Sequence, residues 1–219
     1  MALGGIVFDF DGLVIDTEWS VYQAIAAIYT EHGHELDIDW WRTIVGTVGG
    51  GDWSERLEVL VGSPLDHDEL NRRSVESHHR FVENLVPLPG VAELVVEAHQ
   101  AGLSLGVASS SRTNWLEIHL TRLGLRDRFG TLCGRDLVGD RAKPNPDVYL
   151  AALAALGLDA AEAIAIEDSP HGIAAATAAG LRCVAVPNRI TAPGDFSSAD
   201  LVVGSLAELT LADLQTQFG

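Results

Sequence analysis

Short, continuously apolar runs alternate along this chain with longer segments of helical periodicity. Such runs indicate strands covered by helices on both faces, because a strand with one wet face would alternate apolar and polar residues. The sequence therefore predicts an α/β fold with a Rossmann-like parallel sheet. Asn145 is expected to cap a helix that begins at Pro146. The expected strands are residues 5–8, 103–108, 131–133, 163–166, 182–186 and 201–203, and the expected core helices are residues 91–101, 114–123, 146–156 and 171–179.

The stretch over residues 17–86 breaks this alternation, because it carries helical periodicity without a strand pattern. We therefore expect a small all-helical domain there, inserted after the first strand of a core built from residues 1–16 and 87–219. The proline-rich return VPLPG at residues 86–90 is typical of a hinge or linker.

Composition and charge exclude several classes of partner. With 219 residues, 47% of them apolar, the chain is long enough to bury one sizeable core and a small second domain. Its 14 Lys+Arg against 31 Asp+Glu leave a formal net charge of −17. A protein so acidic lacks the cations that bind the phosphates of nucleic acids or anionic lipids. We therefore expect neither nucleic acid nor a membrane as partner.

Features of the termini and cysteines favour a cytoplasmic protein. Cys133 and Cys183 show no CxxC spacing, and the amino-terminal sequence MALGGIVFDF has no basic region of the secretory type. No apolar run approaches the roughly 18 residues that a membrane span needs. We expect two buried, reduced thiols in a cytoplasmic monomer.

The segment FDFDGLVIDTE at residues 8–18 places two carboxylates directly after the first strand. Asp9 and Asp11, at spacing i, i+2, leave the strand end on the same side, and Gly12 permits a tight turn. Two like charges so close disfavour joint ionisation unless a cation lies between them, and Mg²⁺ is the simplest hard cation for such oxygens. The alternative is a helix N-cap within a solvated acidic turn.

A second pair of carboxylates follows another expected strand, in IEDSPHGIAAATAAG at residues 166–180. Because the carboxyl ends of parallel strands share one edge, Glu167 and Asp168 should converge there with Asp9 and Asp11, where ligands bind. Helix capping would explain this second pair by itself. It does not explain why both pairs should lie at the same edge.

Two further motifs belong to this edge. The strand in LGVASSS ends at Ser109, Ser110 and Ser111, whose hydroxyls and backbone amides can bind an anionic oxygen, although serines are also common helix caps. In AKPNPDVYL, Lys143 lies in a proline-bounded turn before a helix. It is either a counter-charge for a phosphate or a solvated loop residue.

These four motifs, in this order and each after an apolar strand, resemble those of the haloacid dehalogenase superfamily of phosphotransferases. The resemblance covers residues 5–16 and 87–204 and puts the helical insert in the position of that family's cap domain. It implies a Mg²⁺-dependent phosphatase acting through an aspartyl-phosphate intermediate. The implied substrate is a small phosphorylated metabolite, either a sugar phosphate or a nucleotide-like phosphomonoester.

The resemblance also implies catalytic and phosphate-binding roles. Asp9 would attack the phosphorus atom, and Asp11 would protonate the leaving oxygen and later deprotonate the hydrolytic water. The hydroxyl of Ser109, the backbone amide of Ser110 and the ammonium of Lys143 would bind the phosphoryl oxygens.

Metal ligands follow from the same resemblance. Mg²⁺ would be held by the Asp9 carboxylate, the Asp11 backbone carbonyl and Asp168, with Glu167 either bound directly or one shell further out. A phosphate is repelled at long range by so acidic a protein. The metal, Lys143 and helix termini would therefore have to supply the positive charge locally.

Within the superfamily the chain resembles the β-phosphoglucomutase-like group, so a phosphosugar mutase is the alternative function. Those mutases carry a histidine early in the first cap helix and an arginine in a later cap loop. The corresponding positions in this chain are Val21 and the neighbourhood of Gly49 in GTVGGG, which favours the phosphatase. Arg42 and Arg56 are the alternative sources of the arginine. Glu18, Trp19 and Gly49 are the candidates for substrate contact in the cap, whereas Trp115 is expected to be a packing residue.

Two other functions share parts of the pattern. Carbon–halogen hydrolysis also uses the first aspartate, but the dehalogenases lack an acid at the position of Asp11 and need no metal. Receiver domains of phospho-acceptor signalling also gather acids and a lysine at strand ends. Receiver domains lack a helical insert like that over residues 17–86. Asp11 therefore disfavours the dehalogenase, and the insert disfavours the receiver domain.

Overall fold

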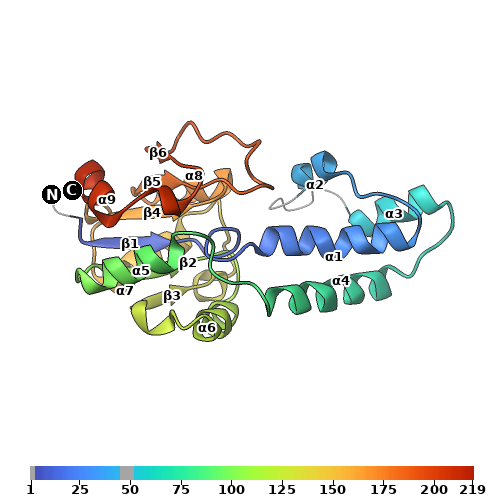
Figure 1. Ribbon diagram of the computed structural model, residues 1–219, viewed down its shortest axis with the longest axis horizontal. Coiled ribbons are helices and arrows are strands. Elements are labelled where there is room, and N and C mark those ends of the chain that lie inside the picture. The colour runs from blue at the N-terminus through green and yellow to red at the C-terminus, as the bar shows by residue number, and fades with distance from the viewer. Residues whose placement is uncertain (1–2, 45–51) are drawn as a thin grey trace. The chain divides into compact units, whose positions relative to one another are not determined.

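A six-stranded parallel sheet forms the centre of the larger part of the computed structural model, which describes residues 3–44 and 52–219 (Figure 1). Its strand order is β3-β2-β1-β4-β5-β6, and each neighbouring pair is parallel. This confirms the predicted α/β class and Rossmann-like sheet. The strands are β1 (Gly5–Phe8), β2 (Ser104–Ala108), β3 (Thr131–Cys133), β4 (Ala163–Glu167), β5 (Arg182–Ala185) and β6 (Leu201–Val202).

Strand β1 lies in the interior of the sheet. Its last residue, Phe8, pairs with Val107 of β2 on one side and with Ile166 of β4 on the other. All four residues of β1 are buried, which explains its uninterrupted apolar sequence. Because of this register, the residues that follow β1, β2 and β4 leave the sheet at the same edge.

Helices from the segments between the strands pack with the sheet. Helices α7 and α8 join β1, β4 and β5 in one buried cluster, to which α8 contributes Ala175 and Ala176. Their small side chains allow the helix to lie close to the strands. The helices are α5 (Val91–Gln100), α6 (Thr113–Arg122), α7 (Asp147–Leu156), α8 (Pro170–Ala178) and α9 (Leu211–Phe218), with 3-10 turns η1 (Arg126–Arg128), η2 (Arg135–Val138), η3 (Ala160–Glu162) and η4 (Leu206–Glu208).

The start of α7 differs from the prediction. Asn145 does not cap this helix: its side-chain amide donates to the Ala142 carbonyl at 2.9 Å, and its backbone N–H donates to the same oxygen. It therefore closes the preceding turn. Pro146 is the N-cap residue, without a side-chain cap, and the helix begins at Asp147.

The chain divides into two compact units. Met1–Asp16 and Val86–Gly219 form one, which we call the sheet unit, and Thr17–Leu85 form the other, the helical unit. In the helical unit α1 and α4 pack along each other (Figure 1). Its helices are α1 (Thr17–Glu31), α2 (Ile38–Ile44), α3 (Trp53–Val61) and α4 (His67–Val82).

Side-chain caps begin two helices of this unit. The Asp52 carboxylate accepts from backbone N–H groups at the start of α3, and Asp66 does the same for α4. On α3, Leu57 is fully buried, but Leu60 is 44% exposed. The two leucines of this helix therefore do not both face the interior.

Two further expectations concern the membrane and the thiols. Within residues 3–44 and 52–219, no helix combines the length and apolarity that crossing a bilayer requires. Cys133 and Cys183 are both buried and free, which confirms the prediction of reduced thiols.

Candidate active site

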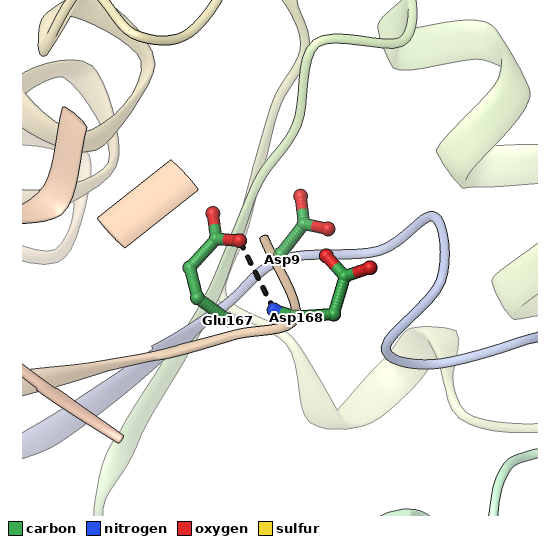
Figure 2. A group of neighbouring side chains, drawn as sticks. All are labelled: Asp9, Glu167 and Asp168. Atoms are coloured by element: carbon green, nitrogen blue, oxygen red, sulfur yellow. Dashed lines mark hydrogen bonds between the residues drawn. The ribbon is translucent and has the colours of Figure 1, made fainter. Parts of the chain in front are cut away.

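Three acidic side chains converge where β1 and β4 end. Asp9 follows β1, Glu167 is the last residue of β4, and Asp168 follows it. Each offers a carboxylate oxygen within 4.8 Å of those of the other two, and all three residues are buried. Figure 2 shows their side chains gathered at the strand ends. We call these three residues the acidic cluster.

Lys143 brings a cation to this cluster. Its Nζ donates to Glu167 Oε1 at 2.6 Å and also to Asp9 Oδ1. Only 6% of its side chain is exposed, and it is the single lysine of the sequence. The solvated-loop alternative for Lys143 is therefore wrong.

The charges of the cluster do not balance. Burial raises the pKa of Asp9 to about 8, against the opposing effect of Lys143. Burial would lower the pKa of Lys143, but the carboxylates of Asp9 and Glu167 outweigh it and hold that pKa above its usual value. One ammonium thus faces three buried carboxylates, which favours uptake of a proton or of a cation. An oxygen-only donor set of this kind fits a hard divalent cation such as Mg²⁺.

Glu167 is held from several directions. The Tyr149 hydroxyl donates to its Oε1 at 2.6 Å, while the Asp168 N–H and the Ser169 hydroxyl donate to Oε2 at 3.2 and 3.4 Å. Burial and the Glu167 charge raise the pKa of Tyr149 well above its usual value, so the phenol stays a donor. A Cβ at Gly172 would lie only 1.9 Å from Glu167 Oε2, so the start of α8 leaves no room for a larger residue.

Asp11 is held by other partners. Its Oδ2 accepts from the Ser111 hydroxyl at 2.6 Å and the Ser109 hydroxyl at 3.3 Å, and its Oδ1 accepts from the Trp115 indole N–H at 3.0 Å. Trp115 was expected as a packing residue; its ring does contact His119, and its hydrogen bond to Asp11 was not predicted. Among the described residues, the carboxylate of Asp11 is not a member of the acidic cluster.

The serine segment also contacts the lysine turn. The Ser110 hydroxyl accepts from the backbone N–H of Lys143 at 3.2 Å, and the Ser109 hydroxyl accepts from the N–H of Ser111 at 2.9 Å. The loops after β2 and β3 are thereby joined beside the acidic cluster. This arrangement brings hydroxyls, backbone amides and an ammonium to the edge where the carboxylates lie.

Asn188, on the loop after β5, is a contact that the sequence did not reveal. Its side-chain amide donates to Asp168 Oδ2 at 2.7 Å and to the Gly12 carbonyl at 3.1 Å. Tyr149 was also missed as a partner of Glu167. An aromatic residue on an amphipathic helix and an asparagine in a loop are ordinary in sequence, so neither carried a signal.

The remaining candidate residues belong to the other unit. Glu18 and Trp19 are in the first turn of α1, and the Trp19 ring stacks on Tyr22 with 4.8 Å between centroids. Val21 follows in the same helix. Gly49 lies outside the described residues.

Comparison with known proteins decides the family. Residues 6–186 match the model of the haloacid dehalogenase-like hydrolases. The chain belongs to this family.

Relatives in this hydrolase family cover nearly the whole chain. YhcW of Bacillus subtilis is 40% identical over 94% of both chains, and hexitol phosphatase B of Escherichia coli is 34% identical over 95% of both. The structure of CbbY from Rhodobacter sphaeroides in complex with phosphate is 31% identical, covers 98% of this chain and 99% of its own, and has a TM-score of 0.76. A CbbY variant in complex with xylulose-(1,5)bisphosphate has a TM-score of 0.77, at 30% identity and 98% and 100% coverage. Like its phosphatase relatives, this member of the family is a phosphoric monoester hydrolase.

Proposed function

We propose that this hydrolase is a Mg²⁺-dependent phosphatase of a small phosphorylated metabolite, a sugar phosphate or a nucleotide-like phosphomonoester. The observation that carries the proposal is the acidic cluster with Lys143 bound to two of its members. One relative is named a hexitol phosphatase, and the structure of another holds a sugar bisphosphate. Both favour a sugar phosphate over a nucleotide-like substrate.

Asp9 is the nucleophile in this proposal. One of its carboxylate oxygens attacks the phosphorus atom, the bond from phosphorus to the ester oxygen breaks, and an aspartyl-phosphate forms. Water then attacks the phosphorus of this intermediate, the bond to Asp9 breaks, and inorganic phosphate leaves. The Lys143 ammonium beside Asp9 orients the carboxylate and favours its ionised, nucleophilic form.

Asp11 is the general acid and base. It protonates the leaving ester oxygen in the first step and accepts a proton from the attacking water in the second. Its contacts with Ser111 and Trp115 hold its carboxylate close to the serine segment, apart from the acidic cluster. Nucleophile and acid therefore occupy different polar surroundings although they are only two positions apart in the chain.

Three groups bind the phosphoryl oxygens. They are the Ser109 hydroxyl, the Ser110 backbone amide and the Lys143 ammonium. The hydrogen bond from the Lys143 backbone N–H to the Ser110 hydroxyl, at 3.2 Å, supports this proposal because it joins the serine segment to the lysine turn. Donors arranged before the reaction stabilise charge that develops in the transition state without having to reorganise.

Asp9, Asp168 and the Asp11 backbone carbonyl would hold the metal, and Glu167 would bind it or support its ligands. When bound, Mg²⁺ would neutralise part of the carboxylate charge and polarise the phosphoryl group. Glu167 already accepts hydrogen bonds at both oxygens, which favours the supporting role.

The helical unit is proposed to act as a cap that determines the substrate. Glu18, Trp19 and Gly49 are the proposed contacts. A cap that closes over bound substrate would hold the substrate against the catalytic groups and exclude bulk water during the first transfer step.

A phosphosugar mutase remains the alternative. It needs cap groups that hold a second phosphate, and Val21 stands where those mutases have a histidine. The two functions differ in the acceptor of the phosphoryl group. Glucose 1-phosphate with a bisphosphate primer should yield inorganic phosphate from this enzyme, whereas primer-dependent formation of glucose 6-phosphate faster than phosphate release would establish a mutase.

Hydrolysis of para-nitrophenyl phosphate tests the proposal directly. We expect turnover with Mg²⁺, loss of turnover with EDTA and recovery when Mg²⁺ is restored, since the donor set consists of hard oxygens. Hydrolysis that continues unchanged in EDTA would contradict the metal requirement. A panel of phosphorylated sugars, nucleotides and short acids would then identify the substrate class.

A further inference from the structure

We propose that Asn188 is a positioning residue that holds Asp168 and the turn after Asp9 in register with each other. Asp168 follows β4 and the turn follows β1, so two separate segments must be aligned to build one metal site. Asn188 lies on a third segment, the loop after β5, and contacts both. The inference rests on the proposed Mg²⁺-dependent function.

The two amide hydrogens of Asn188 are used on different segments. Nδ2 donates to Asp168 Oδ2 at 2.7 Å and to the Gly12 carbonyl at 3.1 Å. A single planar amide therefore sets the distance between one metal-site carboxylate and the backbone immediately after Asp11. A bond to an ionised carboxylate is among the stronger hydrogen bonds of a protein.

The acceptor side of the same amide fixes its direction. Asn188 Oδ1 accepts from the N–H groups of Ile190 at 2.9 Å and Thr191 at 3.1 Å, and the Asn188 N–H donates to Thr191 Oγ1 at 3.0 Å. With its oxygen held by its own loop, the amide must present Nδ2 toward Asp168. The loop thus orients Asn188 in the way that supporting residues orient metal ligands in other proteins.

Gly12 provides a steric argument for the same contact. Its φ is +85°, and a Cβ there would lie 2.4 Å from Asp168 Oδ2 and 2.7 Å from Asn188 Nδ2. The three groups are therefore packed too closely for any side chain at this position. Glycine is needed both for the left-handed conformation and for the approach of the amide.

The neighbouring residue ties the same loop to the far end of the turn. Arg189 Nε lies 3.7 Å from Asp16 Oδ2, and 16% of the Asp16 side chain is exposed. The loop after β5 thus contacts the segment after Asp9 at two points, Gly12 and Asp16. Asn188 is the point that also reaches a carboxylate of the acidic cluster.

The test compares Asn188→Ala with the wild type by Mg²⁺ titration. We expect the Mg²⁺ concentration for half-maximal hydrolysis of para-nitrophenyl phosphate to rise at least about tenfold, as is usual when a residue that orients metal ligands is removed. At saturating Mg²⁺, kcat should recover most of the wild-type value. Calorimetric titration with Mg²⁺ should show the same weakening without substrate, and the Tm without metal should fall by only about 2–4 °C.

Thr191→Val is the matched control. It removes the hydroxyl that accepts from the Asn188 N–H but leaves the side-chain amide and Asp168 intact. Its Mg²⁺ dependence should stay within about twofold of wild type. An equal rise in both variants would assign the effect to general order of the loop and overturn the inference.

The two proposals fail in different ways. If wild-type hydrolysis depends on Mg²⁺ and Asn188→Ala binds Mg²⁺ as tightly as wild type, the positioning role of Asn188 is wrong and the phosphatase proposal stands. If the protein binds Mg²⁺, and binds it more weakly in Asn188→Ala, but hydrolyses no phosphomonoester, the function is wrong and the positioning role stands.

Discussion

Lys143 in the sheet unit and Arg72 in the helical unit each lie between two carboxylates, but their surroundings differ. Lys143 contacts Asp9 and Glu167, and 6% of its side chain is exposed. Arg72 contacts Glu69 at 2.6 Å and Glu76 at 2.5 Å on the surface of α4, with 57% of its side chain exposed. The two groups therefore have similar charges and distances, but the one around Lys143 is buried and the one around Arg72 is exposed to water.

The difference shows where charge can perform chemistry. Water already solvates Arg72 and its partners, so their attraction is screened and contributes little to stability. Lys143 and its partners have lost that solvation, so each charge is stabilised mainly by the others. The same burial raises the pKa of Asp9. The buried group around Lys143 has excess negative charge and can bind a cation or react. The exposed ion pairs of Arg72 are solvated and have neither property.

Asp9→Asn should have the largest effect of any single substitution. The amide has the shape of the carboxylate but is a poor nucleophile, so we expect hydrolysis of para-nitrophenyl phosphate to fall by at least about 10³-fold. Glu69→Gln, the same change in the exposed group around Arg72, should leave activity unaltered. Activity of Asp9→Asn within about tenfold of wild type would remove Asp9 as nucleophile.

Lys143→Met and Arg72→Met test the comparison through stability. Removing Lys143 leaves buried carboxylates without their cation, so the free energy of unfolding in Mg²⁺-free buffer should drop by about 3–5 kcal/mol. Arg72→Met should show no measurable change, because its partners remain solvated. Urea unfolding followed by circular dichroism measures both. Equal losses for the two variants would show that burial does not separate the two groups.

A pair of buried tyrosines provides a finer comparison. Tyr149 donates to Glu167, and Tyr29 donates to the Trp53 carbonyl at 2.8 Å. Tyr149→Phe and Tyr29→Phe should each lower the free energy of unfolding by about 1–2 kcal/mol, since each removes a hydrogen bond made by a buried hydroxyl-bearing side chain. Only Tyr149→Phe should also lower kcat, because Glu167 binds Lys143. A matching loss of kcat in Tyr29→Phe would indicate a general effect of loosened packing.

Asp52 should show the smallest effect. Its carboxylate accepts from the Ser54 hydroxyl and from two N–H groups of α3, which hold its pKa below the usual 3.8. Asp52→Ala should lower the free energy of unfolding by about 1 kcal/mol. Because the folded pKa is lowered, this stabilisation is present above about pH 4 and is lost as the pH falls through the folded value. Stability curves from pH 7 to pH 2 should therefore converge for the two proteins.

Asp52→Asn is the control for that pH effect. The amide oxygen keeps the cap but does not titrate. The free energy of unfolding of Asp52→Asn should fall less than that of wild type as the pH is lowered. An identical fall in the two proteins would show that other groups cause the acid sensitivity.

The fold class was predictable because local patterns carried it. The strand predicted at residues 5–8 is β1, and the one at residues 131–133 is β3, without a shift at either end. In the other predicted strands and helices of the sheet unit one or both ends moved by one residue, and Asn145 proved to close a turn. Each residue of a buried strand must be apolar because both faces of the strand are covered, so the sequence shows the strand directly. The start of a helix depends on which of several nearby hydrogen bonds forms, and the sequence does not show that.

Asp9, Glu167 and Asp168 were predicted as neighbours from the rule that parallel strands share an edge. The roles of Tyr149, Asn188 and Trp115 were not, because each contacts a residue many positions away in the chain. Nothing in the local sequence distinguishes a tyrosine that packs from one that also donates to a buried carboxylate.

The sequence by itself determined the α/β architecture and the presence of acids, serines and a lysine after the strands. These depend on periodicity and on residue type, which local reading detects. Only the tertiary structure decided which groups are bonded to which: Lys143 to Asp9 and Glu167, and Asp11 to Trp115. The physical reason is that burial and hydrogen-bond geometry are properties of segments brought together by folding, so charges that look alike in the sequence differ in strength once water is removed.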